Sequence, residues 1–258
     1  MIKGAGELAS GVAHCLSRCH FNLCMTEIAQ PLAVRREVSF SEAVYDGEQE
    51  IEGVTGSLIS HFYIIKTMWQ EEKIPILVDP EVIIKDFLKP DVLVDAIIAK
   101  KNLGTTITDA SLVIGLGPGF RAGKDVHVVI ETNRGHNLGK VILEGEAEPN
   151  TGIPGMISNV TKERVLYAPE IGRFTTSKKI GDFVQEGEIV GMVGSKPIRT
   201  LANGVVRGLL RNGLEVDKGT KMGDVDPRGI REYCYTISDK ARTIAGGVLE
   251  AILSHFNI

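Results

Sequence analysis

The sequence predicts an α/β protein with a Rossmann-like, mostly parallel sheet domain, followed by a small β barrel-sandwich domain and a C-terminal helix. Three observations lead to this prediction. In the first half, short apolar runs alternate with helical patterns, as they do in βαβ units. From about residue 160, regularly spaced glycines and short alternating runs replace the helical patterns. The segment 239–255 has the apolar spacing of an amphipathic helix.

We expect the first domain over residues 1–158, the β domain over 159–236 and the helix over 237–258. A chain of 258 residues is long enough for one large domain or for two of ordinary size. Near-continuous apolar runs of the kind found in buried parallel strands predict strands at 21–26, 74–78, 92–98, 112–114, 126–131 and 140–143. A helix is expected near 58–71. Only three residues precede the first glycine turn, so either the first strand is unusually short or the chain is cut close to it.

Composition excludes several classes of protein. A formal net charge of -4 gives no basic footprint for nucleic acid, and no apolar run approaches the about 18 residues that a membrane span needs. Four cysteines do not make a disulfide framework. Cys15 and Cys19 fit an apolar helix stripe, and we favour packing over a metal or redox site for them. We therefore expect a soluble cytoplasmic protein with no metal, no nucleic-acid partner and no membrane partner.

A glycine turn opens the chain, and it carries the first functional hypothesis. In a dinucleotide fold Gly4 permits the tight turn, Gly6 lets the backbone approach a pyrophosphate, and the small Ala9 allows close helix–strand contact. Glu27 follows 21 residues after Gly6, where an acid would hydrogen-bond a ribose hydroxyl. The pattern predicts a nucleotide site. The alternative is a strand-to-helix turn without a ligand.

A second glycine-rich loop follows a buried apolar run and supplies Gly115, Gly117 and Gly119. Ligands of open parallel sheets bind beyond the carboxyl ends of the strands, so both glycine loops are expected to face one crevice. Asp95 lies in an apolar strand and is either a structural hydrogen-bonding group or a ligand group.

Arg134 and His136 suit an anionic group, because a guanidinium matches phosphate and carboxylate geometry; the alternative is a polar surface turn. No spacing in this stretch fits a zinc site, and no catalytic residue is identified.

The second half contains an internal repeat. Five positions recur with a constant offset of 32 residues: 172, 174, 181, 184 and 187 match 204, 206, 213, 216 and 219. Two half-units of this kind close together into one compact body. The pattern and the phrase KIGDFVQEG at 179–187 resemble lipoyl and biotinyl carrier domains. Lys196 lies between the halves, where those domains carry their cofactor, but its flanking residues differ from theirs.

Several longer phrases resemble the YqeB-type maturation proteins of the selenium-dependent molybdenum hydroxylase system. The phrases are IKGAGELA at 2–9, MTEIAQPLA at 25–33, DAIIAKKN at 95–102, GPGF at 117–120, RGH at 134–136 and GDVDPR at 223–228. The resemblance implies an accessory protein that prepares a molybdenum hydroxylase client. It also implies a first domain similar to that of the accessory proteins of xanthine dehydrogenase.

The sequence is therefore compatible with three functions. The first is an accessory protein that binds a nucleotide-bearing cofactor, with a molybdopterin nucleotide or NAD(P) as the ligand. The second is an NAD(P)-dependent oxidoreductase, which the sequence favours less because no Tyr-x-x-x-Lys pair stands beside a crevice strand. The third is a carrier protein modified at Lys196. Whether any reaction is catalysed stays open, and so does a homo-oligomer.

Overall fold

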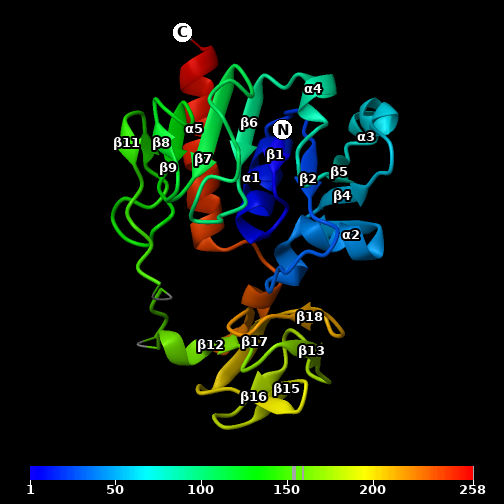
Figure 1. Cartoon of the computed structure of the whole chain (residues 1–258), viewed down its shortest axis with the longest axis vertical. Coiled ribbons are helices and arrows are strands. Elements are labelled where there is room, and N and C mark those ends of the chain that lie inside the picture. The colour runs from blue at the N-terminus through cyan, green and yellow to red at the C-terminus, as the bar shows by residue number, and fades with distance from the viewer. Residues whose placement is uncertain (153–154, 159, 258) are drawn as a thin grey trace. The chain divides into compact units, whose positions relative to one another are not determined.

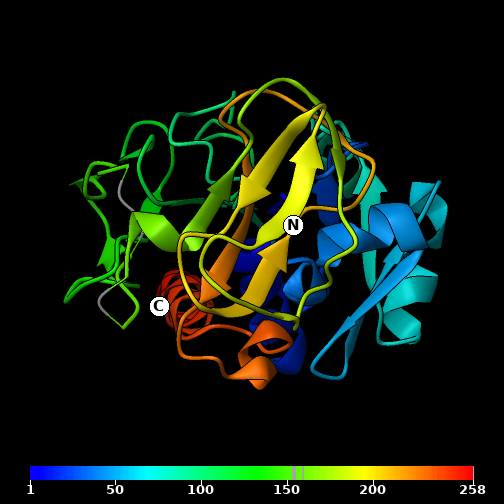
Figure 2. The ribbon, with the colours of Figure 1, turned by 90° about the horizontal axis from the view of Figure 1, so that it is seen from below.

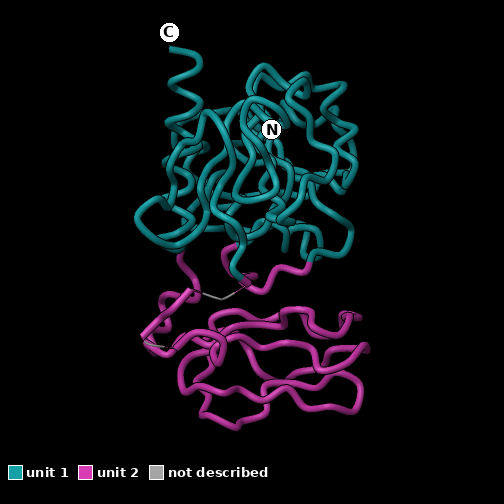
Figure 3. The backbone as a smooth tube through the Cα atoms, turned by 60° about the vertical axis from the view of Figure 1, so that its left-hand side comes forward, with its two compact units in different colours: residues 1–31, 39–151, 237–258 teal, residues 32–38, 152–236 magenta. Residues whose placement is uncertain are grey.

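The computed structural model describes residues 1–152, 155–158 and 160–257. The chain divides into two compact units (Figure 3). The first unit holds residues 1–31, 39–151 and 237–258, and the second holds 32–38 and 152–236. The segment 32–38 thus lies with the second unit and 237–258 with the first, which a contiguous division of the sequence did not anticipate.

A nine-stranded mixed sheet forms the first unit (Figure 1). Its order is β10-β9-β7-β6-β1-β2-β5-β4-β3. Edge strands β10 and β3 run antiparallel to β9 and β4, and the other neighbours pair in parallel. The strands are β1 (Ile2–Lys3), β2 (Met25–Glu27), β3 (Glu48–Ile51), β4 (Val54–Leu58), β5 (Ile74–Val78), β6 (Val92–Asp95), β7 (Leu112–Leu116), β9 (Val128–Ile130) and β10 (Val141–Ile142).

The two-residue strand β1 lies in the middle of this sheet. Ile2 and Lys3 pair with β2 on one side and with β6 on the other. The chain continues from β1 to β2 and β5, and later returns to place β6 on the opposite side of β1. The strand order therefore reverses at β1, and at such a switch point the loops after neighbouring strands diverge and leave room for a ligand.

Two long helices belong to the first unit, α1 (Glu7–Arg18) and α5 (Asp239–Phe256). They pack against each other, and a Cβ on Gly11 would lie 2.8 Å from the Cβ of Ala241. Helix α5 also contacts β7, β9 and β10. Ser238 caps α5 through its side chain, which accepts a hydrogen bond from the Ala241 N–H.

The remaining elements of the first unit are short. They are α2 (Ala43–Asp46), α3 (Ile65–Gln70), α4 (Lys85–Leu88), the 3-10 turns η2 (Phe40–Glu42) and η3 (Phe62–Ile64), and the ribbon of β8 (Arg121–Ala122) with β11 (Gly145–Glu146). Among the described residues, no helix is long and apolar enough to cross a membrane.

Two antiparallel four-stranded sheets form the second unit, with orders β12-β19-β17-β14 and β16-β15-β13-β18. Figure 2 shows the β15–β16 hairpin as two adjacent yellow arrows. Apolar side chains of both sheets, among them Phe174, Val193, Val205 and Val225, form one core. The strands are β12 (Val165–Tyr167), β13 (Gly172–Thr175), β14 (Phe183–Val184), β15 (Ile189–Val193), β16 (Lys196–Arg199), β17 (Gly204–Leu209), β18 (Glu215–Val216) and β19 (Lys221–Asp226); the 3-10 turns are η1 (Arg36–Val38), η4 (Lys162–Arg164) and η5 (Arg231–Cys234).

The backbone of the second unit repeats with the 32-residue period seen in the sequence. Gly172 and Gly204 have φ of 153° and 154°, and Gly187 and Gly219 have 82° and 83°. The strands exchange partners reciprocally, because β13 pairs with β18 and β14 pairs with β17. Each half therefore completes the sheet of the other.

The fold class expected from the sequence is wrong. The large sheet is mixed, and the described residues 96–111 between β6 and β7 form no helix. The C-terminal helix α5 contacts β7 and β9 instead, so a regular βαβ alternation is not needed to cover these strands. The second unit is also not a separate lipoyl-like sandwich: β12 precedes the repeat, and the Leu209 N–H donates to the carbonyl of Val34, far back in the chain. Local sequence patterns carry no information on contacts between residues so far apart in the chain.

Candidate functional site

The first glycine turn follows β1 at the switch point of the sheet. Gly4 has a φ of 97°, a left-handed conformation that favours glycine. A Cβ at this position would also lie 3.3 Å from the carbonyl carbon of Ala96 in the loop after β6. The Gly4 N–H donates to the carbonyl of Thr26, at 2.9 Å. Glycine is therefore required at position 4 for two reasons: the backbone has a positive φ, and the loop after β6 approaches too closely for a side chain.

Gly6 is the N-cap residue directly before helix α1, and its surroundings are more open. Its backbone is extended, with φ of -70° and ψ of -177°, and no side chain caps the helix. A Cβ on Gly6 would meet no heavy atom within 4 Å. Ala9, one turn further, is fully buried. Helix α1 therefore starts without a side-chain cap, beside a position where a Cβ would have room, and an uncapped helix start can bind an anion.

The carboxylate of Glu27 lies directly beside this turn. It accepts the Ala5 N–H at 2.9 Å and the Ile28 N–H at 2.8 Å. Burial raises the pKa of Glu27 despite these hydrogen bonds. The structure thus brings Gly4, Gly6, Ala9 and Glu27 together, as expected, at the carboxyl ends of two neighbouring parallel strands.

Asp95 ends β6 on the other side of β1, and its side chain is satisfied within the protein. It forms an ion pair of 3.3 Å with Lys3 and accepts the hydroxyl of Thr105 at 2.6 Å. Lys3 in turn donates to Thr105 and to the carbonyl of Leu103. Of the two interpretations of Asp95, these contacts favour the structural one, since they tie the loop after β6 to β1.

The second glycine loop is filled by its own neighbours. A Cβ on Gly115 would lie 2.5 Å from the ring of Phe120, and one on Gly117 would lie 2.4 Å from the hydroxyl of Thr132. A Cβ on Gly119 would lie 2.6 Å from the Lys101 nitrogen. Close packing explains why these positions are glycine, so the ligand role predicted for them stays a prediction.

Arg134 and His136 lie in the exposed loop after β9. Arg134 forms two hydrogen bonds with the carboxylate of Asp239, of 2.8 and 2.9 Å, at the first residue of α5. His136 is exposed. The guanidinium fork of Arg134 does bind a carboxylate, but in this structure the carboxylate belongs to the protein.

Two strand-end carboxylates have comparable positions and were not singled out as binding residues. Glu131 directly follows β9, is 2% exposed, and accepts the N–H groups of Asn133 and Glu148. Asp79 directly follows β5 and accepts the Ile84 N–H. The signal that could have found them is an acid immediately after a buried apolar run.

A cavity of about 680 Å³ lies at the opposite, amino ends of the strands. Apolar side chains line much of it, including Leu16, Trp69 and Ile252. Because the glycine turn follows the carboxyl end of β1, this cavity is separate from the candidate site.

Lys196, the residue of the carrier hypothesis, begins β16 next to the turn at 194–195. Its ammonium lies 3.4 Å from the carboxylate of Glu170 and is half exposed. It pairs with Val193 in the hairpin, so it flanks the turn and does not occupy the tip.

No family model matches the chain. It is 48% identical over 253 residues, 98% of its length, to the uncharacterized protein YqeB of Escherichia coli strain K12. The chain is of the YqeB type. This confirms the resemblance to the YqeB type; the relative's name states no activity, so the role in molybdenum hydroxylase maturation stays a prediction. The chain spans about half the length, 47%, of that curated relative.

Similar solved structures are distant. The apo ectoine utilization protein EutE (DoeB) from Ruegeria pomeroyi is 13% identical and has a TM-score of 0.25, with 87% of each chain covered. An aspartoacylase family protein from Mesorhizobium loti is 13% identical and has a TM-score of 0.26, with 57% of this chain and 59% of that chain covered. Likenesses this weak carry no argument about fold or chemistry.

Proposed function

We propose that this chain is a cytoplasmic accessory protein for the maturation of a selenium-dependent molybdenum hydroxylase. In this proposal it binds a nucleotide-bearing cofactor, a molybdopterin nucleotide, at the turn formed by Gly4, Gly6 and Ala9. The molybdenum and selenium part rests on the sequence phrases shared with the YqeB type. The binding part rests on the geometry of the turn.

The observation that carries the binding proposal is the pairing of Gly6 with Glu27. A Cβ on Gly6 would meet no heavy atom within 4 Å, and no side chain caps the start of α1, an arrangement that suits a phosphate group. The Glu27 carboxylate is held beside the turn by two backbone N–H groups, at the distance along the chain where an acid accepts hydrogen bonds from ribose hydroxyls. In this proposal the start of α1 at Gly6 would bind the phosphate, and the Glu27 carboxylate would bind the sugar hydroxyls.

A thermal-unfolding panel tests the ligand. Molybdopterin cytosine and guanine dinucleotides, NAD, NADP, ATP and CTP are added separately to the full chain, and the unfolding midpoint is measured. A ligand that binds only the folded protein raises the midpoint with concentration. We expect a rise with a molybdopterin nucleotide. Stabilisation by NAD(P) alone, with turnover of a reduced substrate, would replace the proposal by the oxidoreductase alternative.

Gly6→Val is the decisive variant for the site. The extended backbone of Gly6 accepts a β-branched residue and its Cβ has room, so the ligand-free midpoint stays close to that of the native protein. The valine side chain would occupy the space proposed for the phosphate, and the ligand-induced rise should vanish. Gly246→Val is the matched control, because Gly246 is exposed on α5 and its Cβ also meets nothing within 4 Å. An unchanged rise in Gly6→Val would exclude the turn as the site.

A further inference from the structure

Two cysteines at the end of helix α1 lie outside the core and take no part in the glycine turn. The apolar stripe expected on this helix is buried at Val12 and Leu16. Cys15 is only half-buried and Cys19 is exposed, and both cysteines are free. Packing, the role favoured for them from the sequence, therefore does not account for Cys19.

One helical turn separates the two cysteines. The Cys19 N–H donates to the Cys15 carbonyl at 3.1 Å, which is the hydrogen bond of an α-helical turn. Residues four apart in a helix project from the same face, with about 5–6 Å between their Cβ atoms. The two thiols are neighbours, because the side chain of Cys15 forms a hydrogen bond with that of Cys19.

The neighbouring thiol also affects the acidity of Cys15. Burial raises the pKa of Cys15, and the charge and the hydrogen bond of the Cys19 side chain raise it further. A negative charge on one sulfur thus disfavours a second negative charge beside it. A cation bound to both sulfurs removes this repulsion.

The helical spacing favours a bridging metal ion over a disulfide. A disulfide needs Cβ atoms about 3.5–4.5 Å apart, closer than the about 5–6 Å of residues four apart in a helix. Forming one would therefore distort the last turn of α1. Metal–thiolate bonds of about 2.3 Å let one ion join two sulfurs up to about 4.6 Å apart, so an ion can bind while the helix stays intact.

The number of available ligands decides the class of ion. Zinc sites in proteins use three or four protein ligands, and the described residues contain no group of three or more His, Cys, Asp or Glu placed to hold a metal. Copper(I) prefers soft thiolate ligands and is stable with two of them. Its complex with two thiolates carries one net negative charge, and Arg18 in the last turn of α1 supplies a positive charge near it.

We propose that Cys15 and Cys19 form a binding site for one copper(I) ion. Each thiol loses its proton and each sulfur forms one bond to the ion, so two protons are released for each ion that binds. The site lies at the end of α1 opposite to the glycine turn, and it does not depend on the proposed maturation role.

Competition for Cu(I) with the coloured chelator bicinchoninate tests this site. The Cu(I)–bicinchoninate complex is mixed with the reduced full chain in the absence of oxygen, and the fall in the absorbance of the complex is measured. We expect the native chain to remove one Cu(I) per chain. Cys15→Ser and Cys19→Ser should each abolish this removal, because each variant loses one of the two thiolates.

A variant with a displaced thiol is the matched control. Cys19→Ser combined with Ser17→Cys keeps four cysteines in the chain, but side chains two residues apart in a helix do not face each other. This variant should therefore remove no Cu(I), and its unfolding midpoint shows that it is folded. Failure of the native chain to remove Cu(I), or native-like removal by Cys19→Ser or by the displaced-thiol variant, would overturn the site.

Discussion

Single carboxylates at the ends of parallel strands organise the loops of the first unit. Glu27, Asp79, Asp95 and Glu131 each accept at least one backbone N–H from the loop beyond their strand or from a neighbouring one. Such groups satisfy N–H donors that would otherwise be buried without partners. Glu27 differs from the others because its carboxylate accepts an N–H of the glycine turn itself, that of Ala5.

Removing one member of the buried Lys3–Asp95 pair should be costly. Asp95→Asn leaves the Lys3 ammonium buried without its counter-charge, and we expect a loss of about 3–5 kcal/mol in the free energy of unfolding. Urea unfolding measures this. The double substitution Lys3→Met with Asp95→Leu removes both charges and should cost less than Asp95→Asn alone. The single variants Lys3→Met and Asp95→Leu complete the comparison. If the double variant loses as much unfolding free energy as these two single variants together, the pair is not coupled.

The stabilisation from Asp226 should depend on pH. Burial alone would raise its pKa, but hydrogen bonds and charge from Arg228 and Arg207 outweigh burial and hold the pKa below its ordinary 3.8. A lowered folded-state pKa stabilises the fold above the unfolded-state value and is lost as pH falls through the folded-state value. The difference in unfolding free energy between the native chain and Asp226→Asn should therefore be full at pH 6 and shrink below about pH 4. A difference that is constant from pH 6 to pH 3 would contradict this.

At the scale of elements, local signals predicted some boundaries well. The expected strand at 74–78 matches β5, and the expected helix at 239–255 ends one residue before α5 does. Of the helix expected near 58–71, the structure forms the 3-10 turn η3 and the short helix α3, while Leu58 still belongs to β4. Apolar spacing in a short window does not separate these states. The β3–β4 hairpin was missed because its strands are largely polar.

The repeated glycines give a matched element-scale test. Gly187 and Gly219 occupy equivalent turns with positive φ, and a Cβ on either meets nothing within 4 Å. Gly187→Ala and Gly219→Ala should therefore each lower the free energy of unfolding by about 1–2 kcal/mol, from backbone strain alone. The two losses should be similar. Gly246→Ala, in the middle of α5, should instead stabilise by about 0.5–1 kcal/mol. Chemical unfolding of the three variants measures this, and unequal costs at the two turns would mean that the halves are not structurally equivalent.

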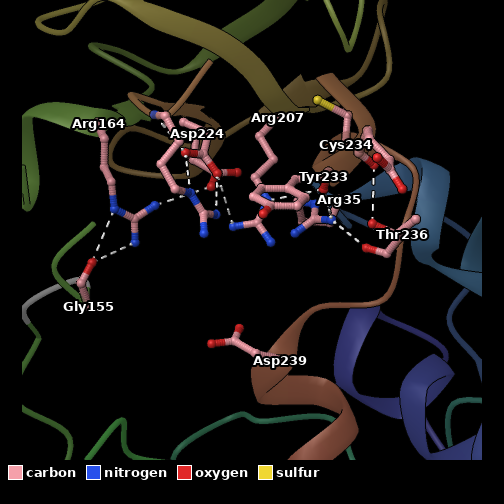
Figure 4. Close-up of polar contacts among 12 residues, drawn as sticks. Arg35, Gly155, Arg164, Arg207, Asp224, Tyr233, Cys234, Thr236 and Asp239 are labelled. Carbon is pink, nitrogen blue, oxygen red and sulfur yellow. Dashed lines mark hydrogen bonds and ion pairs between the residues drawn. The ribbon is translucent and has the colours of Figure 1, made fainter. Parts of the chain in front are cut away.

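At the scale of the whole molecule, the sequence predicted which residues of the glycine turn lie close together, but not how the chain divides into two units. Gly4, Gly6 and Glu27 meet because they belong to one continuous segment, β1–α1–β2, whose two strands are neighbours in the sheet. The segment 32–38 joins the second unit, and α5 returns to the first unit. Both placements depend on contacts between residues that are far apart in the sequence. The hydrogen bond from Arg35 to the carbonyl of Tyr233 (Figure 4) also joins residues that are far apart in the sequence and meet only after folding.

The carrier hypothesis has a whole-molecule test. Lys196 pairs with Glu170 and flanks its hairpin turn, so we expect no lipoyl or biotinyl group on it. The intact mass of the chain purified from its native host should equal the mass calculated from the sequence. A mass increase of either group, mapped to Lys196, would establish the carrier function instead.

The most direct test of the central claim is a calorimetric titration of the full chain with a molybdopterin dinucleotide. We predict saturable binding by the native chain and by Gly246→Val, and none by a folded Gly6→Val variant. Native-like affinity in Gly6→Val, or no binding by the native chain, would contradict a nucleotide site at the glycine turn.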